Sequence, residues 1–269
     1  MGLALLLVIT LITVVSSYFF IAHTWWLPPL AALNGGIDRQ FDLTFVLMGI
    51  VFIAAQLGLA LFVWKYRDRG HKNQGEVYYS HGNTRLELVW TTLTAVLFIG
   101  LVLAGSKIWA ANRWEPAQAG AIPVEVTGMQ FQWYFRYPGP DGKFGRTRSE
   151  LIDPSMGGAG AVGIDGNDPA SKDDVVTNTM YLPVGREVDL SLRSEDVIHS
   201  FFVPAMRFKQ DAVPGLLIHM HFTPDKTGDY EIACAELCGL GHYRMHGVLR
   251  VVSQADFDKW LAAREAEKQ

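Results

Sequence analysis

Both cysteines of the chain lie in the stretch "CAELCGLGHYRM", residues 234–245, which also holds a histidine and a methionine. The spacing is Cys-x3-Cys-x3-His-x2-Met, so one loop can wrap all four side chains around a single point. Two thiolates, an imidazole and a thioether are soft or borderline ligands, and this donor set suits copper. The stretch therefore predicts a metal centre that includes Cys234, Cys238, His242 and Met245.

A mononuclear blue-copper site needs one cysteine, two histidines and a weak methionine, so one thiolate here is surplus to such a site. Two thiolates can bridge two coppers, and a binuclear site then needs a second histidine. The upstream stretch "EDVIHSFFVPAM" supplies His199, with Asp196 and Ser200 nearby as candidates to orient its ring. Two alternatives stay open at this point: a disulfide between the cysteines, and a Cys2His2 zinc site that uses His199 and His242.

A further histidine pair, His219 and His221, occurs in "LLIHMHF". The two residues are two apart on an expected strand and share a face. Because nothing else in this stretch resembles a metal ligand, we interpret them as strand histidines without a metal.

The elements that precede these residues are apolar. The runs at about 2–22, 42–65 and 86–110 each match the roughly 20 residues that a helix needs to cross a membrane. The first run lacks a positively charged start, so we expect a retained third span, with a cleaved signal peptide as the alternative. The net charge is −4 and no basic, aromatic-interleaved stripe occurs, so no nucleic-acid partner is expected.

The loops between these runs predict an orientation. Residues 65–85 carry Lys65, Arg67, Arg69, Lys72 and Arg85, whereas residues 23–40 carry only Arg39. Basic loops stay on the cytoplasmic side. We therefore expect a multi-pass protein of the bacterial inner membrane, with its C-terminal domain in the periplasm.

From residue 122 onward the sequence alternates and is rich in β-branched and aromatic residues, a pattern typical of an antiparallel sandwich or barrel. The predicted fold class is membrane helices plus an all-β domain: a helical region at 1–115, a β-domain at 116–255 and a short exposed helix at 256–269. Within the β-domain, residues 138–174 form a long insert without a strand pattern. We interpret this insert as a solvated, mobile loop, with an acidic docking surface as the alternative.

The ligand loop, the stretch "VIHSFFVPAMRFKQDAVPG" and the helices before the β-domain resemble subunit II of the heme–copper cytochrome c oxidases, from about Asp42 onward. The resemblance implies a cupredoxin-like Greek-key β-barrel that carries copper A, a centre of two copper ions. The implied copper ligands are His199, Cys234, the backbone carbonyl of Glu236, Cys238, His242 and Met245.

The same resemblance implies a function. The chain would be the electron-entry subunit of a terminal oxidase, taking electrons from cytochrome c, or from a c-type cytochrome of a neighbouring complex, to a heme in subunit I. Subunit I would reduce oxygen and translocate protons, and subunit III and membrane lipid are further expected partners. The Glu236 carboxylate would help to bind a magnesium shared with subunit I, unless it is simply exposed on its loop. Glu87 in "LELVW" matches the mouth of a proton channel, and the alternative is an acid that sits among the headgroups.

Electron entry in this family uses an exposed aromatic side chain above the copper, from a strand that corresponds to "GMQFQWYFRY" here. The usual tryptophan position holds Phe131, and Trp133 follows two residues later on what would be the same strand face. We expect Trp133 to be the entry residue, with Phe131 as the second candidate. The alternative is that these aromatics are packed in the core.

Three other functional classes are alternatives. A quinol oxidase subunit has the fold without copper, and the intact ligand set argues against it. A soluble protein of the nitrous oxide reductase type carries a similar copper site, but the apolar spans argue against it. A membrane-tethered copper carrier would not need Glu87 or a magnesium ligand.

Overall fold

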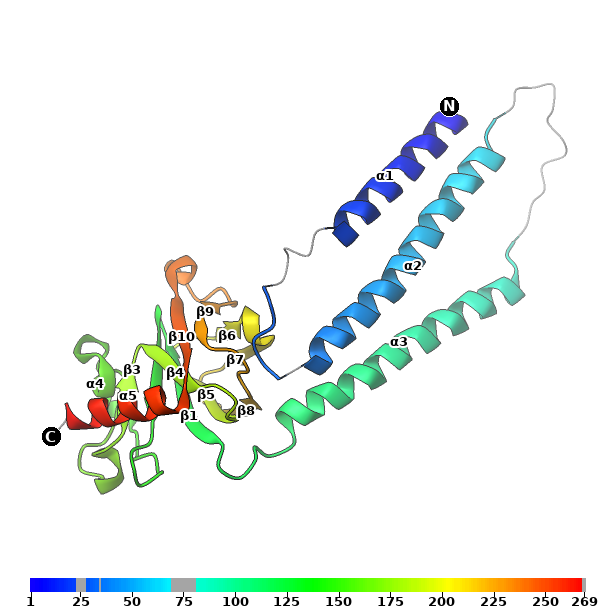
Figure 1. Cartoon of the computed structure of the whole chain (residues 1–269). Coiled ribbons are helices and arrows are strands. Elements are labelled where there is room, and N and C mark those ends of the chain that lie inside the picture. Colours follow the sequence, from blue (N-terminus) through cyan, green and yellow to red (C-terminus); the bar gives the residue numbers. More distant parts are fainter. Residues whose placement is uncertain (23–27, 34, 69–80, 268–269) are drawn as a thin grey trace. The chain divides into compact units, whose positions relative to one another are not determined.

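The computed structural model describes residues 1–22, 28–33, 35–68 and 81–267 (Figure 1). The chain forms two compact units, one of Met1–Leu27 with Gly36–Ile108 and one of Pro28–Gly35 with Trp109–Gln269. Each unit is described by itself. Arg69 and Lys72 of the expected basic loop lie outside the described residues.

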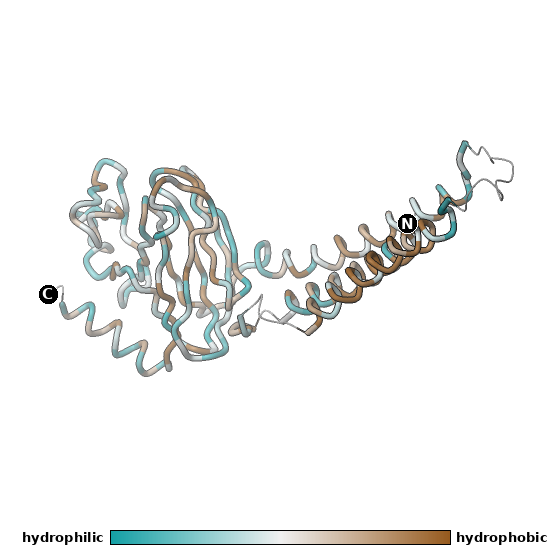
Figure 2. The backbone as a smooth tube through the Cα atoms, turned by 90° about the horizontal axis from the view of Figure 1, so that it is seen from above, coloured by the Kyte–Doolittle hydropathy of each residue, from teal (hydrophilic) through white to brown (hydrophobic). Residues whose placement is uncertain are grey.

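The first unit consists of apolar helices. They are α1 (Gly2–Ala22), α2 (Gly35–Lys65) and α3 (Thr84–Arg113), and all three are long and apolar enough to cross a membrane. Figure 2 shows how hydrophobic residues dominate their length. At most 6% of the residues in each apolar window are buried within the protein, so a large apolar surface is left for lipid. The prediction of three apolar helices is confirmed, although α2 begins at Gly35, before the expected start at 42.

The second unit is a sandwich of two five-stranded sheets. The first sheet contains, in spatial order, β3 (Val175–Thr177), β2 (Gln132–Tyr137), β1 (Ile122–Met129), β5 (Val188–Ser194) and β8 (Ile218–Phe222). The second contains β4 (Thr179–Pro183), β10 (His246–Val252), β9 (Gly228–Cys234), β6 (His199–Val203) and β7 (Phe208–Ala212). One continuous core of buried side chains fills the space between the sheets, so the cupredoxin-like fold class is confirmed.

Both sheets are mixed. The pairs β1–β5 and β4–β10 run parallel, and the other named pairs run antiparallel. The expectation of antiparallel pairing in a sandwich or barrel is therefore wrong for the pairs β1–β5 and β4–β10. Alternating residues report which face of a strand is buried, but not the direction in which its neighbour runs.

Strands β1 and β2 form a hairpin where the sequence pattern reads as one strand. Met129 pairs with Gln132, so the chain reverses at Gln130 and Phe131. A two-residue turn preserves the period of two, and this one lacks the Asn-Gly or Asp-Gly signal that usually marks such turns. Phe131 therefore lies in the turn, and the expectation that it shares a strand face with Trp133 is wrong.

Residues 28–33 also pack into the β-unit. Ala31 and Ala32 are buried in its core. The Ala31 N–H donates to the carbonyl of Ala205 at 2.8 Å, and the Leu33 N–H donates to the carbonyl of Thr223 at 2.9 Å. A short segment that precedes α2 in the chain thus contributes to the sandwich.

The 138–174 segment is folded, which differs from the expected solvated loop. It contains the short helices η2 (Ser149–Leu151), η3 (Pro154–Met156), α4 (Gly158–Ala161) and η4 (Pro169–Ser171). Ala161 and Val162 pack against Met129 and Tyr134 in a small second core. The prediction rested on the many polar residues of the segment. A few apolar residues are nevertheless enough to pack it against the sheet.

Buried charges attach this segment to β1 and β2. Asp174 is fully buried and pairs with Arg136, which also reaches Glu125 at 3.3 Å. Asp165 is 1% exposed and pairs with Arg148 at 3.0 Å. These two acids are paired inside the protein, whereas Asp141, Glu150 and Asp153 of the same segment are exposed.

The chain ends in helix α5 (Gln254–Ala266), as expected. The Ser253 hydroxyl accepts the N–H of Asp256 at 3.2 Å and caps its first turn. Phe257 is buried, and the Trp260 ring stacks on Tyr181 with centroids 4.3 Å apart. This helix closes one side of the core.

Candidate metal centre

The predicted ligands come from two neighbouring strands and the loop after them. His199 begins β6, and Cys234 ends β9, which pairs with β6 in the sheet. The loop from 235 to 245 then returns to β10, and the Cys234 N–H donates to the Met245 carbonyl at 3.1 Å where the loop closes. Sheet pairing therefore brings the two halves of the ligand set together.

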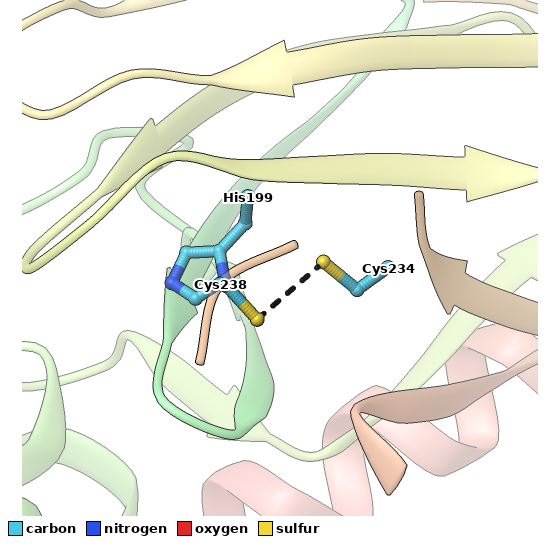
Figure 3. Close-up of side chains that lie close together, drawn as sticks. All are labelled: His199, Cys234 and Cys238. Atoms are coloured by element: carbon cyan, nitrogen blue, oxygen red, sulfur yellow. Dashed lines mark hydrogen bonds between the residues drawn. The ribbon is translucent and has the colours of Figure 1, made fainter. Parts of the chain in front are cut away.

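The ligand atoms converge on one point. The two cysteine sulfurs lie 3.9 Å apart, and His199 stands beside them (Figure 3). The ligand atoms of His199, Cys234 and Cys238 all lie within 4.8 Å of one another, and all three residues are buried.

The remaining expected ligands approach the same two sulfurs. The Cys238 sulfur is 3.7 Å from His242 Nδ1 and 3.7 Å from the Met245 sulfur. The Cys234 sulfur is 3.2 Å from the Glu236 carbonyl oxygen. The structure thus places all six sequence-predicted ligand groups around one centre.

Both cysteines are free thiols. Their separation of 3.9 Å is far from the roughly 2.05 Å of a disulfide bond. The structure therefore differs from the disulfide alternative. The zinc alternative uses a subset of the same converging ligands. A measurement of which metal the protein binds therefore distinguishes zinc from copper.

Asp196 orients His199. Its Oδ1 lies 2.8 Å from His199 Nε2, as the sequence suggested. Ser200 does not share this task, because its hydroxyl donates to Asp211 Oδ1 at 2.7 Å. The other ring nitrogen, His199 Nδ1, is buried and has no hydrogen-bond partner among the described residues. A buried nitrogen of this kind is costly unless something binds it, and a metal ion meets that need.

The electrostatics of the two thiols also favour a bound cation. Burial would raise the pKa of the Cys234 thiol, but the His199 ring and backbone groups at Ser200 and Glu236 lower it to about 6. Burial and the charge of Cys234 raise the pKa of the Cys238 thiol to about 11. Ionisation of one thiol therefore disfavours ionisation of the other, and a metal ion would stabilise both thiolates. Together with the open His199 nitrogen, this soft donor set fits copper.

Trp133 lies behind the centre and not at the surface. It is 1% exposed, with its ring edge-on to His199 at a centroid distance of 5.9 Å and to Phe201 at 5.3 Å. Trp133 is therefore buried, which differs from the exposed position expected of an entry aromatic. Strand β2 directs this side chain into the core between the two sheets, where it packs with His199 and Phe201. Phe131, in the turn, is the half-buried aromatic near the ligand loop.

Sequence reasoning missed two residues that shape the centre. A Cβ on Gly128 would lie 2.9 Å from the Trp133 ring and 3.0 Å from the His199 ring, so only glycine leaves both rings in place. Gln130 hydrogen-bonds to both ligand-bearing regions. An isolated glycine inside a strand pattern was the available signal for a close approach.

Two predicted carboxylates have roles other than copper binding. Glu236 is exposed, so its carboxylate is open to a partner. Glu87 lies in the first turn of α3, where Asn83 Oδ1 accepts the N–H groups of Arg85 and Leu86 at 3.1 Å.

The second histidine pair makes bonds of its own. His221 Nδ1 lies 2.7 Å from Glu187 Oε1, and its Nε2 lies 3.0 Å from the Glu115 carbonyl oxygen. His219 Nδ1 lies 3.2 Å from the Ser191 hydroxyl. These hydrogen bonds occupy both ring nitrogens of His221.

Comparisons with known proteins identify similar sequences. A family model described as cytochrome C oxidase subunit II, periplasmic domain, matches residues 124–252. The "Alternative cytochrome c oxidase subunit 2" of Bradyrhizobium diazoefficiens is 35% identical over 261 residues, covering 96% of this chain and 91% of that protein. The "Cytochrome c oxidase subunit 2" of Thermostichus vulcanus is 28% identical over 312 residues, covering 96% and 83%.

A solved structure is also similar. The periplasmic domain of subunit II of cytochrome oxidase from Bradyrhizobium japonicum has 29% sequence identity and a TM-score of 0.41, covering 58% of this chain and 99% of that one.

The family match extends from β1 into β10 and so includes every predicted metal ligand. The relatives are named as subunits of an oxidase, which confirms the expectation of an oxidoreductase subunit. Because the likeness to the Bradyrhizobium diazoefficiens protein reaches 35% identity and covers 96% of this chain, the chain belongs to the cytochrome c oxidase subunit 2 family.

Proposed function

We propose that this chain is the electron-entry subunit of a membrane-bound terminal oxidase, with a binuclear copper A centre that accepts electrons from cytochrome c. The observation that carries the proposal is the pair of thiols 3.9 Å apart, with His199, His242 and Met245 around them. Bound copper supplies a one-electron redox couple at this point. The electron then passes to a heme in subunit I, where oxygen reduction is coupled to proton translocation.

Side chains of the protein fix the positions of the proposed ligands for electron transfer. Cys234 and Cys238 would hold the metal, and Asp196 fixes the His199 ring through Nε2, which leaves the buried Nδ1 for the metal. Ligands that sit on paired strands and a short closed loop move little when charge changes. A rigid site of this kind favours rapid transfer of one electron at a time.

Electron entry is assigned to Phe131, in place of the earlier expectation of Trp133. Phe131 lies in the β1–β2 turn and is partly exposed, whereas Trp133 is buried against His199. A donor can therefore contact Phe131 directly. Trp133 is then a packing residue that holds His199.

The wider setting completes the proposal. The three apolar helices would lie in a bacterial inner membrane beside lipid, subunit I and subunit III, with the β-domain in the periplasm. The exposed Glu236 carboxylate would help to bind magnesium at the contact with subunit I. Glu87, at the start of α3, would serve the mouth of a proton channel.

The test uses the full chain in detergent, because residues 28–33 belong to the β-unit and a truncated domain would lose them. The reduced protein is loaded with copper, and metal content and the EPR spectrum are measured together. Two coppers per chain, with one unpaired electron shared over both, supports the proposal. One copper, no copper, or a preference for zinc in competition would overturn it and leave a structural role of the quinol oxidase kind.

A further inference from the structure

The turn between β1 and β2 bonds to both ligand-bearing regions of the metal centre. The main-chain N–H of Gln130 donates to Asp196 Oδ2 at 2.7 Å. The other oxygen of Asp196 holds His199 Nε2 at 2.8 Å. The side-chain amide of Gln130 donates to the carbonyl oxygen of Cys238 at 2.5 Å.

From this geometry we propose that Gln130 is a positioning residue that joins the His199 side of the centre to the Cys238 side. The inference rests on the proposed copper function. Gln130 touches no metal ligand atom in these contacts, and it acts through the Asp196 carboxylate and the Cys238 peptide group. The first bond sets the imidazole direction, and the second sets the direction from which the Cys238 side chain leaves the main chain.

The packing of the ligand loop supports this assignment. A Cβ on Gly241 would lie 2.3 Å from the Phe131 ring, and a Cβ on Gly239 would lie 2.8 Å from Gln130 Nε2. The loop therefore approaches the turn so closely that side chains at these two positions would collide with it. Arg244 lies near the Phe131 ring, with its guanidinium carbon 5.8 Å from the ring centroid. The turn thus fits against the loop as well as bonding to it.

Replacing the Gln130 side chain is expected to change metal binding more than the stability of the fold. Replacing the Gln130 side chain leaves its main-chain N–H, and so the bond to Asp196, in place. The bond that is lost is the single donor to the Cys238 carbonyl, and one neutral hydrogen bond contributes little to global stability. Outer partners of metal ligands, however, typically change metal affinity by about 10- to 100-fold when they are removed.

The experiment compares Gln130→Met and Gln130→Glu with wild type in the full copper-loaded chain. Methionine keeps the length of the side chain and removes the donor, whereas glutamate keeps the shape and places a second acceptor opposite the Cys238 carbonyl. Gln132→Met is the matched control. Gln132 is the neighbouring glutamine in β2, and in the described register its strand partner is Met129 of the hairpin. The readouts are the rate of copper loss to a chelator, the EPR hyperfine pattern and the unfolding temperature of the metal-free protein.

We expect Gln130→Met to lose copper about tenfold faster than wild type, with an altered hyperfine pattern and a nearly unchanged unfolding temperature. Gln130→Glu should lose copper faster still, because two acceptors then face each other. A residue that merely packs would show the same behaviour for glutamine and its isostere glutamate. The control should match wild type in all three readouts.

The outcomes separate this inference from the proposed function. If wild type binds two coppers that share an electron, and both Gln130 variants match Gln132→Met, the positioning role is refuted while the copper function stands. If wild type itself binds no copper pair, the proposed function fails, and the inference fails with it.

Discussion

The indole ring of Trp133 lies edge-on to the imidazole of His199, with ring centroids 5.9 Å apart and an interplanar angle of 67°. Both residues are almost fully buried. Gly128, opposite Trp133 in the hairpin, leaves the space that the two rings occupy. The tryptophan thus packs against His199 from inside the sandwich.

Trp133→Ala should therefore act through packing. Removing a large buried aromatic side chain costs about 3–5 kcal/mol, because a cavity remains beside His199. Urea unfolding of the metal-free chain, followed by near-UV circular dichroism, measures this loss. Trp133→Phe should cost much less, since the Trp133 Nε1 has no hydrogen-bond partner among the described residues and its removal breaks no bond. Equal losses for both variants would contradict this account.

Electron entry should depend on Phe131 and not on Trp133. Phe131→Leu keeps an apolar side chain in the turn but removes the aromatic ring, so we expect slower reduction of the copper-loaded protein by a cytochrome c. Stopped-flow kinetics at low ionic strength measures the rate. Trp133→Phe serves as the control and should reduce at a rate close to wild type. A slow Trp133→Phe and a normal Phe131→Leu would restore the original expectation.

Met245→Leu should separate the weak ligand from the thiolates. The Met245 sulfur is 3.7 Å from the Cys238 sulfur, and the residue is buried. Leucine fills a similar volume without a donor atom. We expect two coppers to be retained and the reduction potential to shift, because weak ligands tune potential. Cys238→Ser is the contrasting variant and should lose the shared-electron EPR signal. Copper loss in Met245→Leu equal to that in Cys238→Ser would show that the methionine is a principal ligand.

Sequence reasoning succeeded where residue type alone carries the information. Cysteine, histidine and methionine at short spacing specified the ligand loop, and long apolar runs specified the helices. Sequence reasoning failed where the structure depends on which strands pair with each other. The hairpin turn at Gln130 and Phe131 keeps the alternating pattern intact, so nothing in the local sequence separates one strand of 16 residues from two shorter strands. The single-strand interpretation placed Phe131 on the same face as Trp133, whereas Phe131 lies in the turn.

The same limit explains the 138–174 segment. Its glycines, prolines and acids are typical of a solvated loop, and the partners that seat it lie elsewhere in the chain. Arg136 belongs to β2, yet it is the cation that the buried Asp174 needs. Long-range ion pairs of this kind leave no local periodicity, so only the folded structure reveals them.

The Arg136–Asp174 pair gives a stability prediction. Both side chains are almost fully buried. Asp174→Ala therefore leaves the buried Arg136 guanidinium without its Asp174 partner. Breaking a buried pair from one side costs about 3–5 kcal/mol. The double variant Arg136→Met with Asp174→Leu should recover part of this loss, because the guanidinium is removed together with its partner, while Glu125 keeps Arg193 at 3.8 Å. Thermal unfolding of the metal-free chain measures both, and a double variant less stable than Asp174→Ala would contradict the argument.

Acid should loosen the 138–174 segment through Asp165. The backbone N–H of Asn167, at 3.0 Å, lowers the pKa of Asp165, and Arg148 and Arg146 lower it further against the opposing effect of burial. The pKa is therefore lower in the folded segment than the ordinary value of about 3.9 in an unfolded chain. The ionised carboxylate thus stabilises the fold at any pH above that ordinary value, and the stabilisation is lost as the pH falls through the folded pKa. Hydrogen exchange of amides in residues 146–168, corrected for intrinsic rates, measures the opening of the segment between pH 7 and pH 3.

Asp165→Asn should weaken this pH dependence without abolishing it, because backbone N–H groups of Arg146 and Ala170 also lower the pKa of Asp168. Asp141→Asn is the matched control, since Asp141 is an exposed acid of the same segment. Its exchange curve should follow wild type at every pH. If wild type and Asp165→Asn instead run parallel from pH 7 to pH 3, the buried carboxylate does not hold the segment, and its arginine partners must be satisfied by other acceptors.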